Sequence, residues 1–263
     1  MMQRTLTAIL AIIVFLPFVI YGNWPFILFV YIIATIGLIE LMRMYKIAIS
    51  SLPSILAILF LWLNLFPMHD ASGFIGITDL TQKETIMVFV LLLLSYTVLV
   101  KNKFTFDDTG FILLAVMYVG IGFCYLIETR IAGLNYVFYA LFIVWATDTG
   151  AYLFGRFFGR KKLWPKISPK KTIEGALGGV FLSCIVAVVF QLIYPFPFSM
   201  LIVVGTTIVA SVFGQIGDLV ESAFKRHYNV KDSGNILPGH GGILDRFDSL
   251  LFVLPLLHFI GFI

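Results

Sequence analysis

Long apolar runs follow one another along this chain, separated by short polar breaks, and this feature limits the possible folds more than any other. A helix needs about 20 mostly apolar residues to cross a bilayer. Hydrophobic residues make up 60% of the 263 residues and charged residues 12%, whereas soluble domains average about 45–50% and about 25%. So much apolar surface is compatible only with a membrane, which excludes a soluble enzyme, a disordered chain and a fibrous protein. We therefore expect an all-α, polytopic membrane protein.

Nine of these runs are predicted to be transmembrane helices, the shorter ones extended by flanking residues. They are Leu6–Ile20, Trp24–Met42, Leu52–Phe66, Thr85–Val100, Phe111–Ile127, Leu134–Phe154, Ala176–Tyr194, Met200–Val220 and Ser249–Ile263. Arg4 precedes the first run, but no small-x-small cleavage site follows it. We therefore expect a retained helix at this position rather than a signal peptide.

The uneven distribution of lysine and arginine among the loops predicts the orientation. A cytoplasmic N-terminus places 16 of the 18 basic residues on the cytoplasmic side and only Lys83 and Arg130 outside. The opposite orientation would reverse this ratio. The chain is therefore expected to have its N-terminus inside, its C-terminus outside and an odd number of spans.

Charge also divides the chain into two parts with different expected roles. Residues 1–139 contain seven acids and seven bases, mostly in loops or at helix ends, and are predicted to form a transmembrane scaffold. Residues 140–263 contain seven acids and eleven bases, so the whole net charge of +4 lies there. Because ionisable groups near membrane depth are costly and mark function, residues 140–263 are expected to be the catalytic region of one compact membrane domain.

The first polar cluster runs from Trp145 to Gly175. Asp148 lies well inside an apolar run, where an asparagine would pack without the desolvation cost of a carboxylate. Seven bases and no acid occupy residues 156–171, and the segment Ser168-Pro169-Lys170-Lys171-Thr172 combines hydroxyls and cations in an expected rigid turn. These are the groups that a polyphosphate needs. Gly175 and Gly179 form a small-xxx-small pair that predicts close helix packing.

The second polar cluster runs from Gly217 to Asp248. If the eighth span stays helical, then Asp218, Ser222 and Lys225 share one face, at i, i+4 and i+7. Residues 231–242 contain four glycines and a proline, which predicts a loop whose backbone N–H groups approach an anion. This loop is not the G-x-x-x-x-G-K-[ST] motif, so Walker-type chemistry is not supported.

Acidic residues in this second cluster are the expected metal ligands. Asp245 and Asp248 open the ninth span, and magnesium prefers one or two carboxylates together with substrate phosphate oxygens. Asp218 and Asp245, from neighbouring helices, would supply such a pair. His240 is a candidate ligand, proton carrier or phosphate donor that ranks below the aspartates. Together these residues indicate metal-dependent phosphoryl or nucleotidyl transfer onto a membrane-bound acceptor, without fixing the base or the lipid.

The segment Ser222–Asp248 also resembles the phosphatidate cytidylyltransferase family, the CDP-diacylglycerol synthases. The family pattern is carried here by Ser222, Lys225-Arg226, Lys231-Asp232, Gly234, Leu237-Pro238, His240-Gly241-Gly242, Asp245-Arg246 and Asp248. Similar motifs are Asp148-Thr149-Gly150-Ala151-Tyr152, Gly155-Arg156, and Ser168-Pro169-Lys170-Lys171-Thr172 with Glu174-Gly175. The resemblance covers roughly residues 145–250, and the N-terminal half adds only hydropathy.

This resemblance implies that CTP and phosphatidic acid react, with magnesium, to give CDP-diacylglycerol and pyrophosphate. It implies an enzyme of the cell (inner) membrane whose active site faces the cytoplasm, a homodimer among membrane lipids, and no nucleic-acid partner. Whether two divalent ions bind, or one together with a monovalent cation, stays open.

The same resemblance, together with the chemical reasoning given above, assigns a role to each candidate residue. The expected catalytic residues are Asp218, Asp245, Lys225, Arg226, Asp148 and His240. The expected substrate-binding residues are Ser168, Lys170, Lys171, Thr172, Ser222, Lys231, Gly241, Gly242 and Arg246. Metal is expected at Asp218, Asp245 and Asp248. Asp148, Asp232 and Asp248 are second-rank candidates for binding metal, binding ribose or ordering the cations.

Three other functions stay as alternatives. A CTP-dependent lipid-alcohol kinase would give CDP and a phospholipid instead. A transporter of anionic solutes would place charges towards the membrane midplane, whereas here they concentrate on one side. A purely structural scaffold would leave the glycine-rich loop and the acid pairs without a cause.

Overall fold

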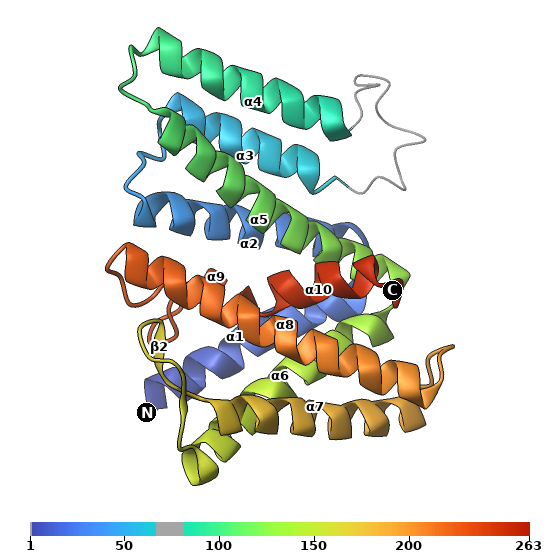
Figure 1. Cartoon of the computed structure of the whole chain (residues 1–263). Coiled ribbons are helices and arrows are strands. Elements are labelled where there is room, and N and C mark those ends of the chain that lie inside the picture. The colour runs from blue at the N-terminus through green and yellow to red at the C-terminus, as the bar shows by residue number, and fades with distance from the viewer. Residues whose placement is uncertain (1, 67–81) are drawn as a thin grey trace. The chain divides into compact units, whose positions relative to one another are not determined.

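The computed structural model describes residues 2–66 and 82–263 (Figure 1). The chain divides into two compact units: one comprises Met1–Gly22 with Thr129–Ile263, and the other comprises Asn23–Glu128. The first helix therefore groups with the C-terminal half of the chain. We call these the C-terminal unit and the N-terminal unit.

Helices account for nearly all the regular structure of both units. The C-terminal unit contains α1 (Met2–Tyr21), α6 (Leu134–Phe158), β1 (Lys162–Trp164), β2 (Ser168–Thr172), α7 (Ile173–Ile193), α8 (Met200–His227), α9 (Leu244–Phe247) and α10 (Leu250–Phe259). The N-terminal unit contains α2 (Asn23–Met44), α3 (Leu52–Asn64), α4 (Gln82–Leu99) and most of α5 (Phe106–Ala132). A helix occurs at each of the nine expected segments, which confirms the prediction of a helical membrane protein.

Helix length separates these elements into two groups. Within the described residues, five helices are long and apolar enough to cross a membrane, namely α2, α5, α6, α7 and α8. The apolar parts of α1, α3 and α10 are shorter, at 10–17 residues. The structure thus supports several transmembrane helices.

Glycines allow α6 and α7 to approach closely. A Cβ atom at Gly150 would lie 2.5 Å from the carbonyl oxygen of Gly178. At Gly179 it would lie 2.7 Å from the carbonyl oxygen of Thr147, and at Gly175 it would lie 2.7 Å from that of Ala151. The predicted packing role of Gly175 and Gly179 is therefore confirmed, and the contact is between backbones.

A similar close approach joins α8 to the start of α10. A Cβ atom at Gly217 would lie 2.6 Å from the carbonyl oxygen of Asp248. Because Asp218 follows Gly217 in α8, this packing brings the backbone of one expected metal ligand next to another.

The segment Ser168–Thr172 is a strand, so the expectation of a rigid turn there was wrong. It forms β2, which pairs antiparallel with β1. The turn lies at residues 165–167, where Pro165 fits the turn geometry and the N–H of Ile167 donates to the carbonyl of Trp164 at 3.1 Å. The strand then ends in an N-cap, since the N–H of Gly175 donates to Thr172 Oγ1 at 3.1 Å and begins α7.

Replacing a packed glycine by alanine tests the close contact between α6 and α7. We expect Gly179→Ala to lower the midpoint of thermal unfolding in detergent, because the strain of about 1–3 kcal/mol from overpacking exceeds the gain in helix propensity of about 1 kcal/mol. Gly205→Ala is the matched control, since Gly205 also lies in a helix but a Cβ there meets nothing within 4 Å. Equal midpoints for the two variants would contradict this packing.

Candidate active site

Three carboxylates from three elements lie close together in the C-terminal unit. Asp148 comes from α6, Asp218 from α8, and Asp248 directly follows α9. Burial raises the pKa of the Asp248 carboxyl to about 7, and the nearby negative charges of Asp218 and Asp148 add to this rise. Such mutual repulsion makes the cluster a favourable place for a cation.

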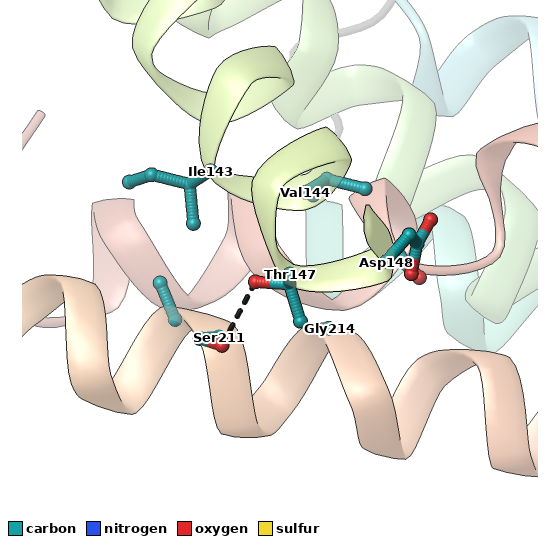
Figure 2. A pocket seen from close by; sticks show the side chains of 8 residues that line it. Ile143, Val144, Thr147, Asp148, Ser211 and Gly214 are labelled. Atoms are coloured by element: carbon teal, nitrogen blue, oxygen red, sulfur yellow. Dashed lines mark hydrogen bonds between the residues drawn. The ribbon is translucent and has the colours of Figure 1, made fainter. Parts of the chain in front are cut away.

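Figure 2 shows how α6 presents Asp148. The hydroxyl of the preceding Thr147 is directed at α8, where it lies 2.8 Å from the hydroxyl of Ser211, and both groups are buried. The Asp148 side chain leaves the helix in a different direction, and it is solvent-exposed. The buried hydrogen bond therefore fixes the rotation of α6 against α8 that turns Asp148 away from this contact.

A lysine of β2 reaches the same cluster. Lys171 Nζ lies 2.5 Å from Asp218 Oδ2, and the two side chains are 24% and 31% exposed. The hydroxyl of Ser222, one turn further along α8, donates to Asp218 Oδ1 at 3.3 Å. The structure thus joins the two polar clusters of the sequence, and it places Ser222 on the same helix face as Asp218, as the helical period predicted.

Asp245 organises the glycine-rich loop. Its Oδ2 accepts three hydrogen bonds of 2.8 Å each, from the N–H and the hydroxyl of Ser233 and from the N–H of Gly242. Its Oδ1 accepts from Lys225 Nζ at 2.6 Å. Burial alone would raise the pKa of Asp245, but these donors outweigh it and lower the pKa to about 2. The carboxylate is therefore charged and bonded on both oxygens.

Gly241 is required next to this carboxylate. Its φ angle of +87° lies in the region that favours glycine, and a Cβ atom there would collide with the carboxylate of Asp245. The loop also folds back on itself, since the N–H of Leu237 donates to the carbonyl of Gly241 at 3.0 Å.

Glu221 completes the network and was missed by the sequence analysis. It is fully buried in α8 and forms an ion pair with Lys225 one turn later. The ammonium group of Lys225 therefore lies between two carboxylates, those of Glu221 and Asp245. The i, i+4 spacing of Glu221 and Lys225 was the available signal.

A cavity of about 520 Å³ opens beside this network. Three cations line it, namely Lys170 from β2, Lys231 from the loop and Arg246 from α9. The remaining lining residues come from the loop: Asp232, Asn235, Leu237, Pro238, Gly239, His240 and Gly241. The volume lies within the range of small-molecule sites, and the excess of positive charge suits a polyphosphate.

The sequence comparisons place this arrangement in a known family. The profile of the cytidylyltransferase family matches residues 2–263. The chain belongs to this family. It is 52% identical over 263 residues to a phosphatidate cytidylyltransferase of Bacillus subtilis (strain 168), which covers 99% of this chain and 97% of the relative. It is also 52% identical over 258 residues to the phosphatidate cytidylyltransferase of Staphylococcus saprophyticus, with 98% of each chain covered.

Three predicted site residues of this cytidylyltransferase-family chain have structural contacts away from the cavity. Arg226 Nε donates to the carbonyl of Ile167 in the hairpin turn at 3.3 Å, which holds the hairpin beside the end of α8 (Figure 1). Thr172 caps α7. Ser168 pairs with Trp164 across the hairpin. Within the described ranges, none of the three lines the 520 Å³ cavity.

Metal-ligand candidates differ in how well they fit a cation. Across residues 2–66 and 82–263, no three His, Cys, Asp or Glu side chains form a ready-made metal cluster. The negative charge of Asp218 contributes to the raised pKa of Asp248, and a magnesium ion shared by the two and completed by phosphate oxygens would relieve this repulsion. Asp245 would have to give up one of its present donors to join them.

Gly241→Ala tests the link between the loop and Asp245. We expect it to displace the loop and to reduce the activity of the purified protein at least about tenfold, because both the backbone angle and the Cβ collision oppose the native loop. Ser233→Ala removes only one of the three donors to Oδ2, so a smaller loss is expected. Wild-type activity in Gly241→Ala would contradict the assigned loop geometry.

Proposed function

We propose that this chain transfers the cytidylyl group of CTP to phosphatidic acid and releases pyrophosphate, forming CDP-diacylglycerol for phospholipid biosynthesis. The observation that best supports this proposal is the cationic cavity beside the cluster of Asp148, Asp218 and Asp248, in a chain 52% identical to phosphatidate cytidylyltransferases. A phosphate oxygen of phosphatidic acid attacks the α-phosphorus of CTP, and the bond to the bridging oxygen of the β-phosphate breaks. The attacking phosphate is already ionised at neutral pH, so the step needs no strong general base.

The residues of the cavity would hold the triphosphate. Lys170, Lys231 and Arg246 come from three different segments and surround the cavity, so they bind phosphate oxygens from several sides. Lys171 lies at the boundary between the cavity wall and the acidic cluster, where its ammonium group pairs with Asp218. Lys225, held by Glu221 and Asp245, positions the loop in our proposal.

Magnesium would complete the site at Asp218 and Asp248, with Asp148 nearby and Asp245 as the further candidate. Bound there, a divalent ion neutralises the triphosphate and the charge that develops on the leaving pyrophosphate. The cations of the cavity would bind the remaining oxygens of the triphosphate.

The membrane arrangement is also part of this proposal. Nine spans with the N-terminus inside would place the cationic cavity at the cytoplasmic face of the cell (inner) membrane, where both CTP and the lipid headgroup are available. The homodimer implied by the resemblance remains a proposal as well, for which the mass of the purified protein in detergent is the direct measurement.

Asp218→Asn and Asp248→Asn test the metal site. We expect each to reduce CDP-diacylglycerol formation at least about a hundredfold, because loss of one carboxylate removes several kcal/mol of metal-dependent stabilisation. Asp107→Asn, an exposed acid of the N-terminal unit, is the control and should keep the wild-type rate. Stabilisation of the fold by magnesium, seen as a raised unfolding midpoint, should disappear in Asp218→Asn. Unchanged turnover in both site variants would remove the metal assignment.

Product analysis separates the proposed reaction from the alternatives. Protein supplied with CTP, magnesium and phosphatidic acid should release pyrophosphate and form a CDP-lipid in equal amounts. Release of CDP with a lipid alcohol as acceptor would favour the kinase instead. Movement of an anionic solute into vesicles without cleavage of CTP would favour the transporter.

Single cysteines report the orientation. In a Cys124→Ser, Cys184→Ser background, a cysteine introduced at Lys231 should react with a membrane-impermeant maleimide only after the cells are opened. A cysteine introduced at Lys83 should react in intact cells. The reverse pattern would contradict a cytoplasmic N-terminus and an inward-facing site.

A further inference from the structure

A second cavity, of about 380 Å³, lies in the N-terminal unit. It is formed where the α2–α3 and α4–α5 connections meet at one end of the unit (Figure 1). The polar and aromatic residues that line it are Tyr45, Lys46, Ser51, Tyr96, Lys103, Phe104 and Asp108. It shares no residue with the cavity of the candidate active site.

The aromatic walls of this second cavity are held in place by contacts between rings. The ring of Tyr45 stacks on Phe111, with centroids 4.1 Å apart. The ring of Tyr96 meets Phe104 edge-on, with centroids 5.6 Å apart. Such paired rings are rigid and carry a polar end, which suits a site at a membrane–water boundary.

The one acid in the wall is already engaged. Asp108 Oδ2 accepts from the N–H of Thr105 at 2.6 Å and from its hydroxyl at 2.8 Å, which caps α5. The hydroxyl of Tyr45 also donates to Asp108. Lys46 and Lys103 are exposed, and neither forms an ion pair with any residue in the described ranges. The cavity is therefore cationic where a ligand would enter.

The cavity also lies where the apolar surface of the helices ends. Leu99, the last residue of α4, is 78% exposed, and Phe106, the first residue of α5, is 74% exposed. Exposed apolar side chains at helix ends contact lipid in a membrane protein, so the cavity is adjacent to the bilayer. A ligand of this site must then satisfy two conditions: it is anionic, and it is present at the membrane boundary.

We propose that this cavity binds the phosphate group of an anionic phospholipid of the surrounding leaflet, at a site separate from cytidylyl transfer. The ammonium groups of Lys46 and Lys103 contact the phosphate, and Tyr96 offers a hydroxyl and a ring to the glycerol region. The positive-inside rule explains the sign of the charge at this end of the unit. It does not explain why two of the lysines line a cavity with aromatic walls.

The ends of α2 and α4 supply an unusually well matched pair of variants. Lys46 (φ +68°) and Lys101 (φ +56°) both adopt the left-handed backbone conformation just after a helix. In each case the N–H of the next residue donates to a carbonyl in the last turn of the helix. The N–H of Ile47 donates to the carbonyl of Met42, and the N–H of Asn102 donates to the carbonyl of Thr97, both at 2.9 Å. Glycine is preferred at this position. Both Lys46→Gly and Lys101→Gly therefore remove a charge while suiting the backbone, but only Lys46 lines the cavity.

Photochemical labelling by a lipid tests the proposal. The whole protein is reconstituted in phosphatidylcholine vesicles that contain phosphatidylglycerol with a photoactivatable group near its headgroup. Labelling of the peptides 45–53 and 96–108 is then quantified. We expect Lys46→Gly to lower it about fivefold, as for loss of one lysine contact with an anionic lipid, and Lys101→Gly to stay within about twofold of the wild type. Lys103→Gln should reproduce the loss.

Further measurements distinguish a lipid phosphate from inorganic phosphate and test whether the variants are folded. A photoactivatable phosphatidylcholine should label these peptides equally in the wild type and in Lys46→Gly, and an excess of inorganic phosphate should not displace the anionic lipid. The thermal unfolding midpoints of both glycine variants should equal or exceed that of the wild type. Equal labelling of the wild type and Lys46→Gly would overturn the proposal, as would equal losses in the two glycine variants. Displacement by inorganic phosphate would overturn the assignment to a lipid.

Discussion

The pairing of the Lys225 ammonium group with two buried carboxylates is the interaction on which the rest of the candidate site depends. The ammonium group lies between Glu221 and Asp245, whose side chains are 1% and 5% exposed. Removing one partner of a buried ion pair leaves an uncompensated charge and costs about 3–5 kcal/mol. Here the consequence extends further, because Asp245 is also the acceptor that gathers Ser233 and Gly242. One charged network therefore joins α8 to the glycine-rich loop that forms a wall of the cavity.

Glycine-mediated packing supplies the second half of the arrangement. At Gly150 and Gly217 the helices approach so closely that backbone meets backbone, between α6 and α7 and between α8 and the start of α10. Asp148 lies two residues before Gly150, and Asp218 directly follows Gly217, so both acids lie next to a fixed helix contact. Acidic groups that repel one another are therefore held together by apolar and backbone contacts, which leaves their negative charge available to a cation.

The sequence predicted whatever depended on local periodicity. Apolar runs identified the helices, and the 3.6-residue period correctly placed Asp218 and Ser222 on one face of α8. It failed at Ser168–Thr172, because hydroxyls, lysines and a proline are equally compatible with a turn and with a short edge strand. Pairing with Lys162–Trp164 decides between the two, and this is a contact that local sequence does not specify.

Tertiary contacts also explain why Glu221 was missed and why Asp245 has an additional role. Nothing in the sequence distinguishes Glu221 from an exposed partner of Lys225, since burial depends on how the folded chain packs against this face of α8. The expectation for Asp245 counted its carboxylate as a metal ligand but not the donors that converge on it. Those donors come from Lys225 of α8 and from Ser233 and Gly242 near the two ends of the loop, so their convergence arises only when the loop closes.

Two separate groups of cations, one in each unit, show that the positive charge of the loops does not by itself explain where the lysines lie. A lysine in a loop satisfies the positive-inside rule in any direction that it points. In the C-terminal unit, Lys171 and Lys225 instead pair with acids, and Lys170 and Lys231 line a 520 Å³ cavity. Lys46 and Lys103 line a second cavity that has aromatic walls. A soluble triphosphate and a membrane lipid differ in how they reach a protein, the first through water and the second along the bilayer surface. Cations placed in an open polar cavity serve the first route, whereas cations beside exposed apolar helix ends serve the second.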